Sequence, residues 1–528
     1  MRANFRLFFF VGILAMILAT LASHRVCWAD RSEDEGFSIV VRQFKIVGNT
    51  ALDDEWILEL LEPYTRKPQS LAELKGAARK LTQAYRDRGY FVATAYVPPQ
   101  VFDGKTVTIR VLEGKVRNVR IEGANHYPER FIRRYLGPAL KEGVLRRDSL
   151  QKALLTLNQF QDLTVQSVIE PKGEKGVDLI LKVKDRSPVH VALEYDNYGN
   201  RLVGRQRVGL GVSAGNALTT GDTLVARVTR PFEADDAKPY IQAGYSFPVG
   251  KKGTRLELNY ANTQTLAGEE LRVLDIRGDL NLWAFRVLVP GTLTLEKSSY
   301  WTGELFSKTV KNTYYGGLPL THDEIRALAF AHRGTKWRSR EGSQVSYGAG
   351  LTVGLGDWLG GTPSGSTNSS RIGADNAFGK LNGDLAYIKK WGERSFFVAR
   401  ATGQYAGDGL LVSEQFSLGG PDSVRGYNPG EFLGDNAIQF TAEYRRSLLE
   451  GSSNNLQLVV FADHGKAWLK DALTGEVPSL SLTGAGVGVR GTLGRHVTYR
   501  TDVGVPLSPN RNLQGDSVTV HSQVTSRW

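Results

Sequence analysis

The chain has 528 residues, of which 41% are hydrophobic and 58 are glycine, with one cysteine and a formal net charge of +12. This hydrophobic fraction excludes a bundle of membrane helices but not a membrane β-barrel, whose apolar residues are spread by alternation. Lysine and arginine are scattered without a basic run, so the charge does not indicate nucleic-acid binding.

Residues 1–29 have the pattern of a cleaved signal peptide. Two arginines precede an uncharged apolar run of 16 residues over 7–22, and Ala29 occupies a small-residue position before the expected cleavage site. The run is shorter than the ~20 residues that a membrane helix needs, and an uncleaved anchor is the alternative. Cleavage would remove Cys27 and three arginines (+12 − 3 = +9), leaving a short segment 30–36 and no thiol for a disulfide or a metal.

Two units of similar organisation are expected at residues 37–114 and 115–187. The first is predicted to contain, in order, a strand over 37–47, a short helix ending at Leu61, a longer helix from Ser70 to Gly89, and strands over 90–97 and 105–113. The second is predicted to contain a strand over 116–122, helices over 128–136 and 148–159, and strands over 164–171 and 177–184.

The order β-α-α-β-β therefore occurs twice, which indicates an internal duplication of a small α+β domain. Similar turns, Gly48-Asn49 and Gly123-Ala124-Asn125, follow the first strand of each unit. Two unrelated α+β domains are the alternative, and the matched turns and helix lengths argue against it.

Residues 188–528 read as a third, all-β region. Apolar and polar residues alternate, as in Val189 to Asp196 and Arg207 to Val212. A transmembrane strand needs about 9–11 residues, and with its connection it takes roughly 20, so about 16 antiparallel strands are expected. A soluble β-sandwich is the alternative. The terminal Trp528 is the aromatic residue with which outer-membrane barrels usually end, and we interpret it as a barrel-assembly signal.

Two short motifs stand out in this region. One is Val424-Arg425-Gly426-Tyr427, preceded by Gly-Gly-Pro-Asp-Ser and therefore expected in a loop. The other is Phe461-Ala-Asp463-His-Gly465, in which alternation places Phe461, Asp463 and Gly465 on one face of a strand. Two lone opposite charges inside a barrel would need each other, because an unpaired charge away from water is costly.

Together these features resemble the two-partner secretion transporters, the hemolysin-activator and filamentous-hemagglutinin transporter (TpsB-type) family. The resemblance covers nearly all of the chain after residue 36. It implies two periplasmic POTRA domains and an outer-membrane β-barrel in a Gram-negative cell. It also implies that the loop of Val424, Arg425, Gly426 and Tyr427 folds into the lumen and that Arg425 pairs with Asp463 on the barrel wall.

The chemistry of these residues agrees with that implication. Arginine offers a planar fork for a carboxylate, Gly426 permits a sharp turn, and Gly465 leaves room for close approach. The alternative is that Arg425 lies in an exposed turn while Asp463 merely lines water. Two departures from the family pattern occur. Gln159–Leu163 replaces a Leu-Pro-Gly segment, and only about seven residues lie between Ala29 and residue 37, so a plug helix is not expected.

The sequence indicates no enzyme, cofactor or metal site. Alternation places His464 and Asp463 on opposite faces of the strand, which excludes an acid–base dyad. The Gly486–Gly491 segment matches a dinucleotide-binding pattern, yet it lies among alternating strand residues with no helix after it.

The resemblance implies an outer-membrane pore that recognises a large partner exoprotein, of hemolysin or adhesin type, and translocates it without nucleotide hydrolysis. The other expected partners are outer-membrane lipid and, for the chain's own biogenesis, the barrel-assembly machinery and periplasmic chaperones. A barrel-assembly insertase of the same superfamily and a passive porin are the alternatives.

Overall fold

The computed structural model describes residues 38–141, 143–232, 238–451, 453–508 and 517–528. The expected signal peptide, the segment 30–36 and the expected absence of a plug helix all lie outside the described residues. The chain divides into two compact units, Met1–Gly114 and Lys115–Trp528.

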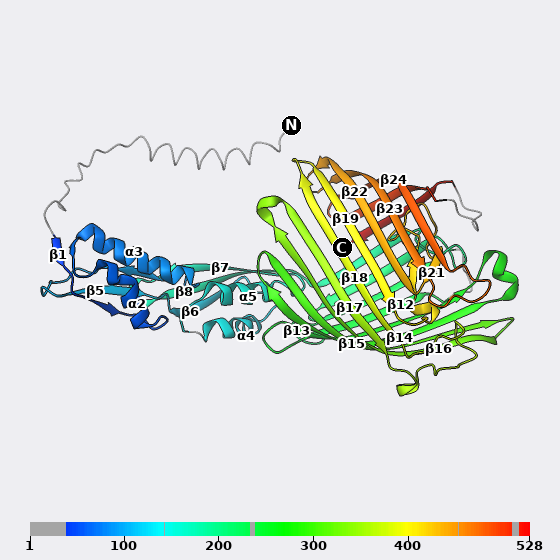
Figure 1. Ribbon diagram of the computed structural model, residues 1–528, viewed down its shortest axis with the longest axis horizontal. Helices are drawn as coiled ribbons and strands as arrows, with labels where there is room; N and C mark the ends of the chain where they lie inside the picture. The colour runs from blue at the N-terminus through cyan, green and yellow to red at the C-terminus, as the bar shows by residue number, and fades with distance from the viewer. Residues whose placement is uncertain (1–37, 142, 233–237, 452, 509–516) are drawn as a thin grey trace. The chain divides into compact units, whose positions relative to one another are not determined.

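The first unit is a small sheet with helices packed on it (Figure 1). The sheet has the order β2-β5-β4, and β2 runs parallel to β5. Its elements are β1 (Ser38–Val40), β2 (Gln43–Val47), α2 (Asp54–Leu61), β3 (Pro68–Ser70), α3 (Leu71–Asp87), β4 (Thr94–Tyr96) and β5 (Thr106–Leu112). The predicted order β-α-α-β-β is confirmed, with the small pair of β1 and β3 added.

Two expected strands of this unit differ from the prediction. The continuous strand predicted over 37–47 is broken at residues 41–42, because the chain changes partner there. The Val41 carbonyl accepts the amide of Arg66, whereas the amides of Arg42 and Gln43 both donate to Lys105. The strand expected over 90–97 is likewise shortened to β4.

The longer helix begins and ends where the sequence predicts. The Ser70 hydroxyl accepts the Glu73 amide while the Glu73 carboxylate accepts the Ser70 amide at 2.7 Å, a capping box. The hydrogen bond from the Ser70 backbone holds the pKa of Glu73 below its ordinary value. Gly89, with φ +91°, follows the helix as the residue that reverses the chain.

The second unit opens with the same α+β arrangement. Its first elements are β6 (Val116–Glu122), α4 (Glu129–Leu140), α5 (Arg147–Leu157), β7 (Leu163–Pro171) and β8 (Val177–Asp185). The sheet has the order β6-β8-β7, with β6 parallel to β8 and β7 antiparallel to it. Central strands therefore correspond: β5 in the first repeat and β8 in the second.

A carboxylate at the end of each central strand anchors the turn after the first strand. Glu113 accepts the backbone amides of Thr50 and Ala51 at 2.6 and 2.8 Å. Asp185 accepts the backbone amides of residues 125–127 at 2.6 to 3.0 Å. Burial raises the pKa of Asp185, but these three backbone hydrogen bonds outweigh it and leave that pKa below its ordinary value.

The turn glycines correspond as well. Gly48 and Gly123 have φ of +92° and +85°, and a Cβ on either would lie 2.5 Å from a carbonyl oxygen, of Val111 and Val183 respectively. Each of those carbonyls lies two residues before the anchoring carboxylate. Matching turns, contacts and anchors are what a duplication of one domain produces.

The rest of the second unit is a barrel. The described residues form 16 antiparallel strands in chain order, and β26 closes the sheet against β9 (Figure 1). The strands are β9 (Val189–Asp196), β10 (Arg207–Gly215), β11 (Thr223–Pro231), β12 (Tyr240–Val249), β13 (Thr254–Leu266), β14 (Arg277–Leu293), β15 (Lys297–Tyr314), β16 (Leu318–Arg338), β17 (Ser343–Gly354), β18 (Gly379–Trp391), β19 (Ser395–Ala406), β22 (Asn436–Glu450), β23 (Asn455–Trp468), β24 (Ser479–Leu493), β25 (Val497–Pro506) and β26 (Thr519–Arg527).

The alternation has the predicted sense. Apolar residues such as Leu193 and Leu210 are exposed on the outer face, whereas Asp463 and Asp502 are buried on the inner face. A closed sheet with an apolar exterior is a membrane barrel and not a sandwich, whose apolar residues would be inside. Among the helices of the described residues, none is both long and apolar enough to cross a membrane.

The α+β domain of this unit contacts the barrel through residues 159–163, the segment that departs from the family pattern. Gln159 donates to the Tyr300 hydroxyl at 2.6 Å. Asp162 lies 2.6 Å from the imidazole of His190 on the first barrel strand. These contacts are at the barrel end where β9 begins, which we call the proximal end.

Candidate functional site in the barrel lumen

The predicted lumen loop connects β19 to β22. A short hairpin within it pairs β20 (Phe416–Leu418) with β21 (Phe432–Gly434), and the hairpin tip carries Arg425. Arg425 is 2% exposed, so the tip lies inside the barrel and the alternative of an exposed turn is wrong.

Arg425 makes a bidentate contact with Asp463 of β23. Its Nε donates to Oδ2 at 2.7 Å and its Nη2 donates to Oδ1 at 2.9 Å, while the backbone amide also donates to Oδ2 at 3.1 Å. The guanidinium lies 3.5 Å from the ring centroid of Phe461. The bidentate contact, the Phe461 ring and the backbone hydrogen bond together fix both the position and the orientation of the Arg425 side chain.

Two further carboxylates complete the surroundings of Arg425. Its Nη1 donates to Oε1 of Glu443 at 2.7 Å and lies 3.6 Å from Oδ1 of Asp502. Both carboxylates are almost fully buried, on wall strands β22 and β25, which are separated by β23 and β24. The buried cation therefore faces three carboxylates, which the two-residue interpretation of the sequence did not include.

Three wall arginines balance these carboxylates. Arg445 donates to Glu443, Arg490 bridges Glu443 and Asp502 at 3.0 and 2.7 Å, and Arg500 donates to Asp502 at 2.8 Å. Four arginines and three buried carboxylates form one network across β22 to β25. Arg500 also donates to the exposed Asp422 of the loop, a fourth carboxylate.

Glycines make room for the loop on the wall. A Cβ on Gly484 would lie 1.9 Å from the carbonyl oxygen of Arg425, and one on Gly504 would lie 2.5 Å from the amide nitrogen of Gly426. A Cβ on Gly465 would lie 2.6 Å from Leu418. Gly426 has φ +99° and itself packs against the wall. The backbone of the loop tip therefore rests directly on the backbone of the barrel.

Apolar residues hold the loop beside the charged network. Val424 and Tyr427 are buried with Leu418 and with Leu482 of β24. The Tyr427 hydroxyl donates to the Thr483 carbonyl at 2.9 Å and accepts the Ser508 amide at 3.1 Å.

The stem of the loop has two more buried carboxylates, which form three ion pairs. Glu414 lies between Lys308 of β15 and Lys380 of β18, at 2.8 Å from the latter. Asp435, 0% exposed, accepts from Arg371 of the β17–β18 loop at 2.5 Å. The loop is thus fixed at its tip to β22, β23 and β25 and at its stem to β15 and β18.

Sequence reasoning found Arg425 and Asp463 but missed Glu443, Arg490 and Asp502. Alternation places each of these three on an inward face, together with many other polar residues, so no local signal distinguishes them. The strand register decides which inward-facing residues lie near Arg425. Phe461 lies opposite Glu443 and Gly486, and Gly488 lies opposite Asp502.

The described geometry offers no catalytic arrangement at these motifs. His464 points away from Asp463 and contacts Thr483 on the exposed outer face. The Gly486–Gly491 segment lies wholly within strand β24. Within the described ranges, no group of three or more His, Cys, Asp or Glu residues could hold a metal ion.

Comparison with known proteins agrees with the fold and the motifs. The family model described as haemolysin secretion/activation protein ShlB/FhaC/HecB matches residues 175–491, and that of the ShlB-type POTRA domain matches residues 39–114. The outer membrane transporter CdiB of Escherichia coli O6:K15:H31 is 26% identical over 513 residues, which is 93% of this chain and 82% of CdiB.

The heme/hemopexin transporter protein HuxB of Haemophilus influenzae (strain 86-028NP) is 24% identical over 417 residues, 78% of this chain and 72% of HuxB. The solved structure of CdiB from Escherichia coli has the same fold, with a TM-score of 0.78 at 23% identity over 94% of this chain and 92% of that chain.

Fold, lumen loop and comparisons define an outer-membrane β-barrel with periplasmic POTRA domains. The chain belongs to the haemolysin secretion/activation family, the outer-membrane transporters of two-partner secretion. The proximal end of the barrel is therefore the periplasmic end, and its opposite end is extracellular.

Proposed function

We propose that this chain recognises one large partner exoprotein in the periplasm and translocates it through the barrel to the cell surface without nucleotide hydrolysis. The observation that carries the proposal is the lumen loop, fixed by buried Arg425 to Asp463 and Glu443. A loop tied by charge to the pore wall can hold the pore in one state and be displaced by a passing chain.

The proposal divides the chain into a signal peptide (1–29), a short segment (30–36), POTRA domains at 37–114 and 115–187, and the barrel at 188–528. The POTRA sheets have edge strands, β4 and β7 among them, to which an extended exoprotein segment can add as a further strand. Folding of the exoprotein outside the cell would give the transport its direction. Chaperones and the barrel-assembly machinery would serve the chain's own biogenesis, with Trp528 as its signal.

Deletion of the gene and comparison of secreted proteins tests this function. We expect one large exoprotein to disappear from the medium and to return with the wild-type chain. Arg425→Ala should not restore it although the barrel assembles, because removal of one partner leaves buried carboxylates uncompensated. Arg338→Ala is the matched control, since Arg338 forms an exposed ion pair with Glu341 whose loss costs little.

Three outcomes would contradict the proposal. Normal secretion by Arg425→Ala would remove the lumen pair from the mechanism. Loss of many outer-membrane barrels instead of one exoprotein would indicate an insertase. Unchanged secretion on deletion, with a large steady conductance of the purified barrel, would indicate a porin.

A further inference from the structure

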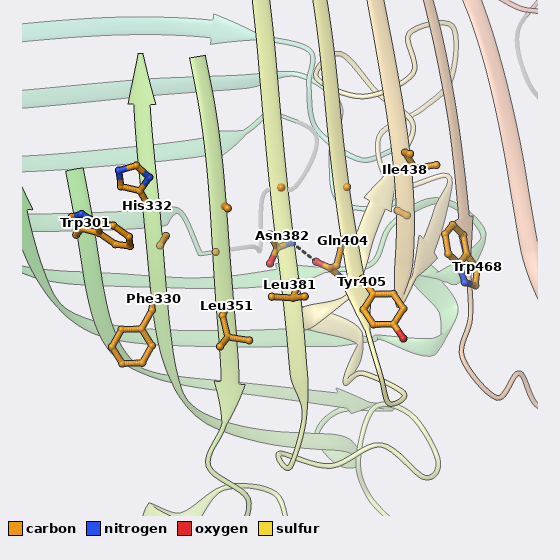
Figure 2. A pocket seen from close by; sticks show the side chains of 16 residues that line it. Trp301, Phe330, His332, Leu351, Leu381, Asn382, Gln404, Tyr405, Ile438 and Trp468 are labelled. Carbon is orange, nitrogen blue, oxygen red and sulfur yellow. Dashed lines mark hydrogen bonds between the residues drawn. The ribbon is translucent and has the colours of Figure 1, made fainter. Parts of the chain in front are cut away.

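A groove of about 780 Å³ lies on the outer face of the barrel wall (Figure 2). One side of it is a row of large side chains, one from each of four adjacent strands: Phe330 of β16, Leu351 of β17, Leu381 of β18 and Tyr405 of β19. Register pairs them in that order, and each is more than 40% exposed. The row therefore faces the membrane and not the lumen.

The floor of the groove consists of small residues. Ala349, Gly383 and Gly403 are paired in register on β17, β18 and β19, two residues away from the large row along each strand. A Cβ on Gly383 would have no atom within 4 Å. Packing of the barrel therefore does not require glycine at this position, and its absent side chain is what opens the groove.

The register row of the floor crosses the membrane obliquely. On one side it continues to His332 and Trp301, which is four residues from the periplasmic start of β15. On the other side it continues to Ile438 and Lys466, which is two residues from the extracellular end of β23. The groove thus leads from inside the hydrocarbon layer toward the outer surface, the path that an acyl chain follows.

A cation lies beside the extracellular end of the groove. Lys466 is exposed on the outer face, next to Ile438, which lines the groove, and no ion pair of Lys466 occurs within the described part of the chain. An ammonium group on a lipid-facing wall is costly unless it reaches the headgroup layer or an anion. The apolar groove suits an acyl chain, and the adjacent cation suits a phosphate attached to it.

We propose that this groove binds one phosphorylated lipid of the outer leaflet, with an acyl chain over Gly383 and the phosphate at Lys466. Binding at this position covers the strands whose inner faces hold the stem of the lumen loop, since Gln404, beside Gly403, donates to the Glu414 carbonyl. The site does not depend on the proposed transport of an exoprotein.

Native mass spectrometry of the full-length chain in detergent, titrated with diphosphoryl lipid A, tests the site. We expect one lipid A per wild-type chain and at least a tenfold loss of affinity in Gly383→Phe, whose ring would fill the groove. Ala349→Phe should act in the same way. Lys466→Met should weaken lipid A about fivefold, because it removes the cation that contacts the phosphate.

Ala462→Phe is the control, because Ala462 is exposed on the outer face of β23 but does not line the groove. The affinity of Ala462→Phe for lipid A should equal that of the wild type. Heat-modifiable migration in gel electrophoresis should report a folded barrel for every variant. Unchanged lipid A binding by Gly383→Phe and Ala349→Phe, or an equal loss of affinity in Ala462→Phe, would contradict lipid binding in the groove. An unaffected Lys466→Met would overturn the phosphate contact.

Discussion

Arg425 is surrounded by charge in a way that its sequence motif alone does not convey. Its guanidinium uses Nε, Nη1 and Nη2 against Asp463 and Glu443, and a ring covers one face. An arginine without these partners could not remain 2% exposed, because the desolvation of a charge exceeds what one hydrogen bond returns. Loss of any one of these partners would therefore disturb the position of the loop.

Glu443 accepts hydrogen bonds from three arginines of the network, Arg425, Arg445 and Arg490. We expect Glu443→Gln to lower the opening free energy of the loop tip by about 3 kcal/mol, as for a broken buried ion pair. Hydrogen exchange of the amides of residues 419–430 measures this. Glu257→Gln, in a partly exposed ion pair elsewhere on the wall, should leave those amides unchanged.

Gly484 tests the close contact between loop and wall independently of charge. A valine there would place its Cβ 1.9 Å from the Arg425 carbonyl oxygen, so we expect the loop tip to leave the wall and single-channel conductance to rise. Gly379→Val is the control, because a Cβ on Gly379 would have no atom within 4 Å. Equal conductance of both variants would contradict the docking of the loop against Gly484.

The repeated α+β domain depends on one carboxylate at the end of its central strand. In the second repeat Asp185, whose side chain is 0% exposed, accepts three backbone amides of the turn at residues 125–127. A buried carboxylate with several amide donors stabilises the ionised form, which is why hydrogen bonding overcomes burial and lowers its pKa. The turn and the strand are thereby joined across a long sequence separation.

We expect Asp185→Asn to cost about 1–3 kcal/mol in the opening free energy of these turn amides. Since the folded pKa is lowered, the wild-type advantage is fully present above the unfolded value of about 3.9 and is lost as the pH falls through the folded pKa. Hydrogen exchange at pH 7 and pH 5 should therefore give the same difference between the two chains.

Glu170→Gln, in an exposed ion pair with Arg120, provides the baseline for that comparison. An advantage of the wild type that disappears between pH 7 and pH 5 would show that the carboxylate titrates too high to be stabilised by the turn.

On the scale of the whole second unit, the α+β domain contacts the barrel through aromatic rings and a glycine turn. A Cβ on Gly221, in the β10–β11 turn, would lie 2.6 Å from Phe131 and 3.0 Å from Phe160. The two rings are 4.9 Å apart in an edge contact. This turn therefore contacts Phe160 of Gln159–Leu163, the segment that replaces the family's Leu-Pro-Gly.

We expect Gly221→Leu to separate the α+β domain of this unit from the periplasmic rim and to raise hydrogen exchange at residues 159–163 at least tenfold. Gly250→Leu is matched for backbone strain, because Gly250 also has a positive φ in a periplasmic turn, but a Cβ there would meet no atom within 4 Å. Similar exchange in both variants would mean that backbone strain, and not the ring contact, holds the domain.

The sequence by itself determined the duplication and the barrel, whereas the Arg425–Asp463 pair was implied by the resemblance to the family. Helix caps such as Ser70, turn glycines and period-two alternation act within a few residues, so they can be read from the chain. The break of the expected strand at residues 41–42 could not be predicted from local patterns, because it depends on a change of pairing partner. Its cause is distant in sequence, at Arg66 and Lys105.

Only the tertiary structure decided which inward-facing charges surround the loop. Glu443, Arg490 and Asp502 lie on three different strands, and closure of the barrel in one register brings them to Arg425. The outer groove has the same origin, since Ala349, Gly383 and Gly403 become neighbours only across paired strands. Local patterns fix the elements, whereas register and closure place residues far apart in the chain against one another.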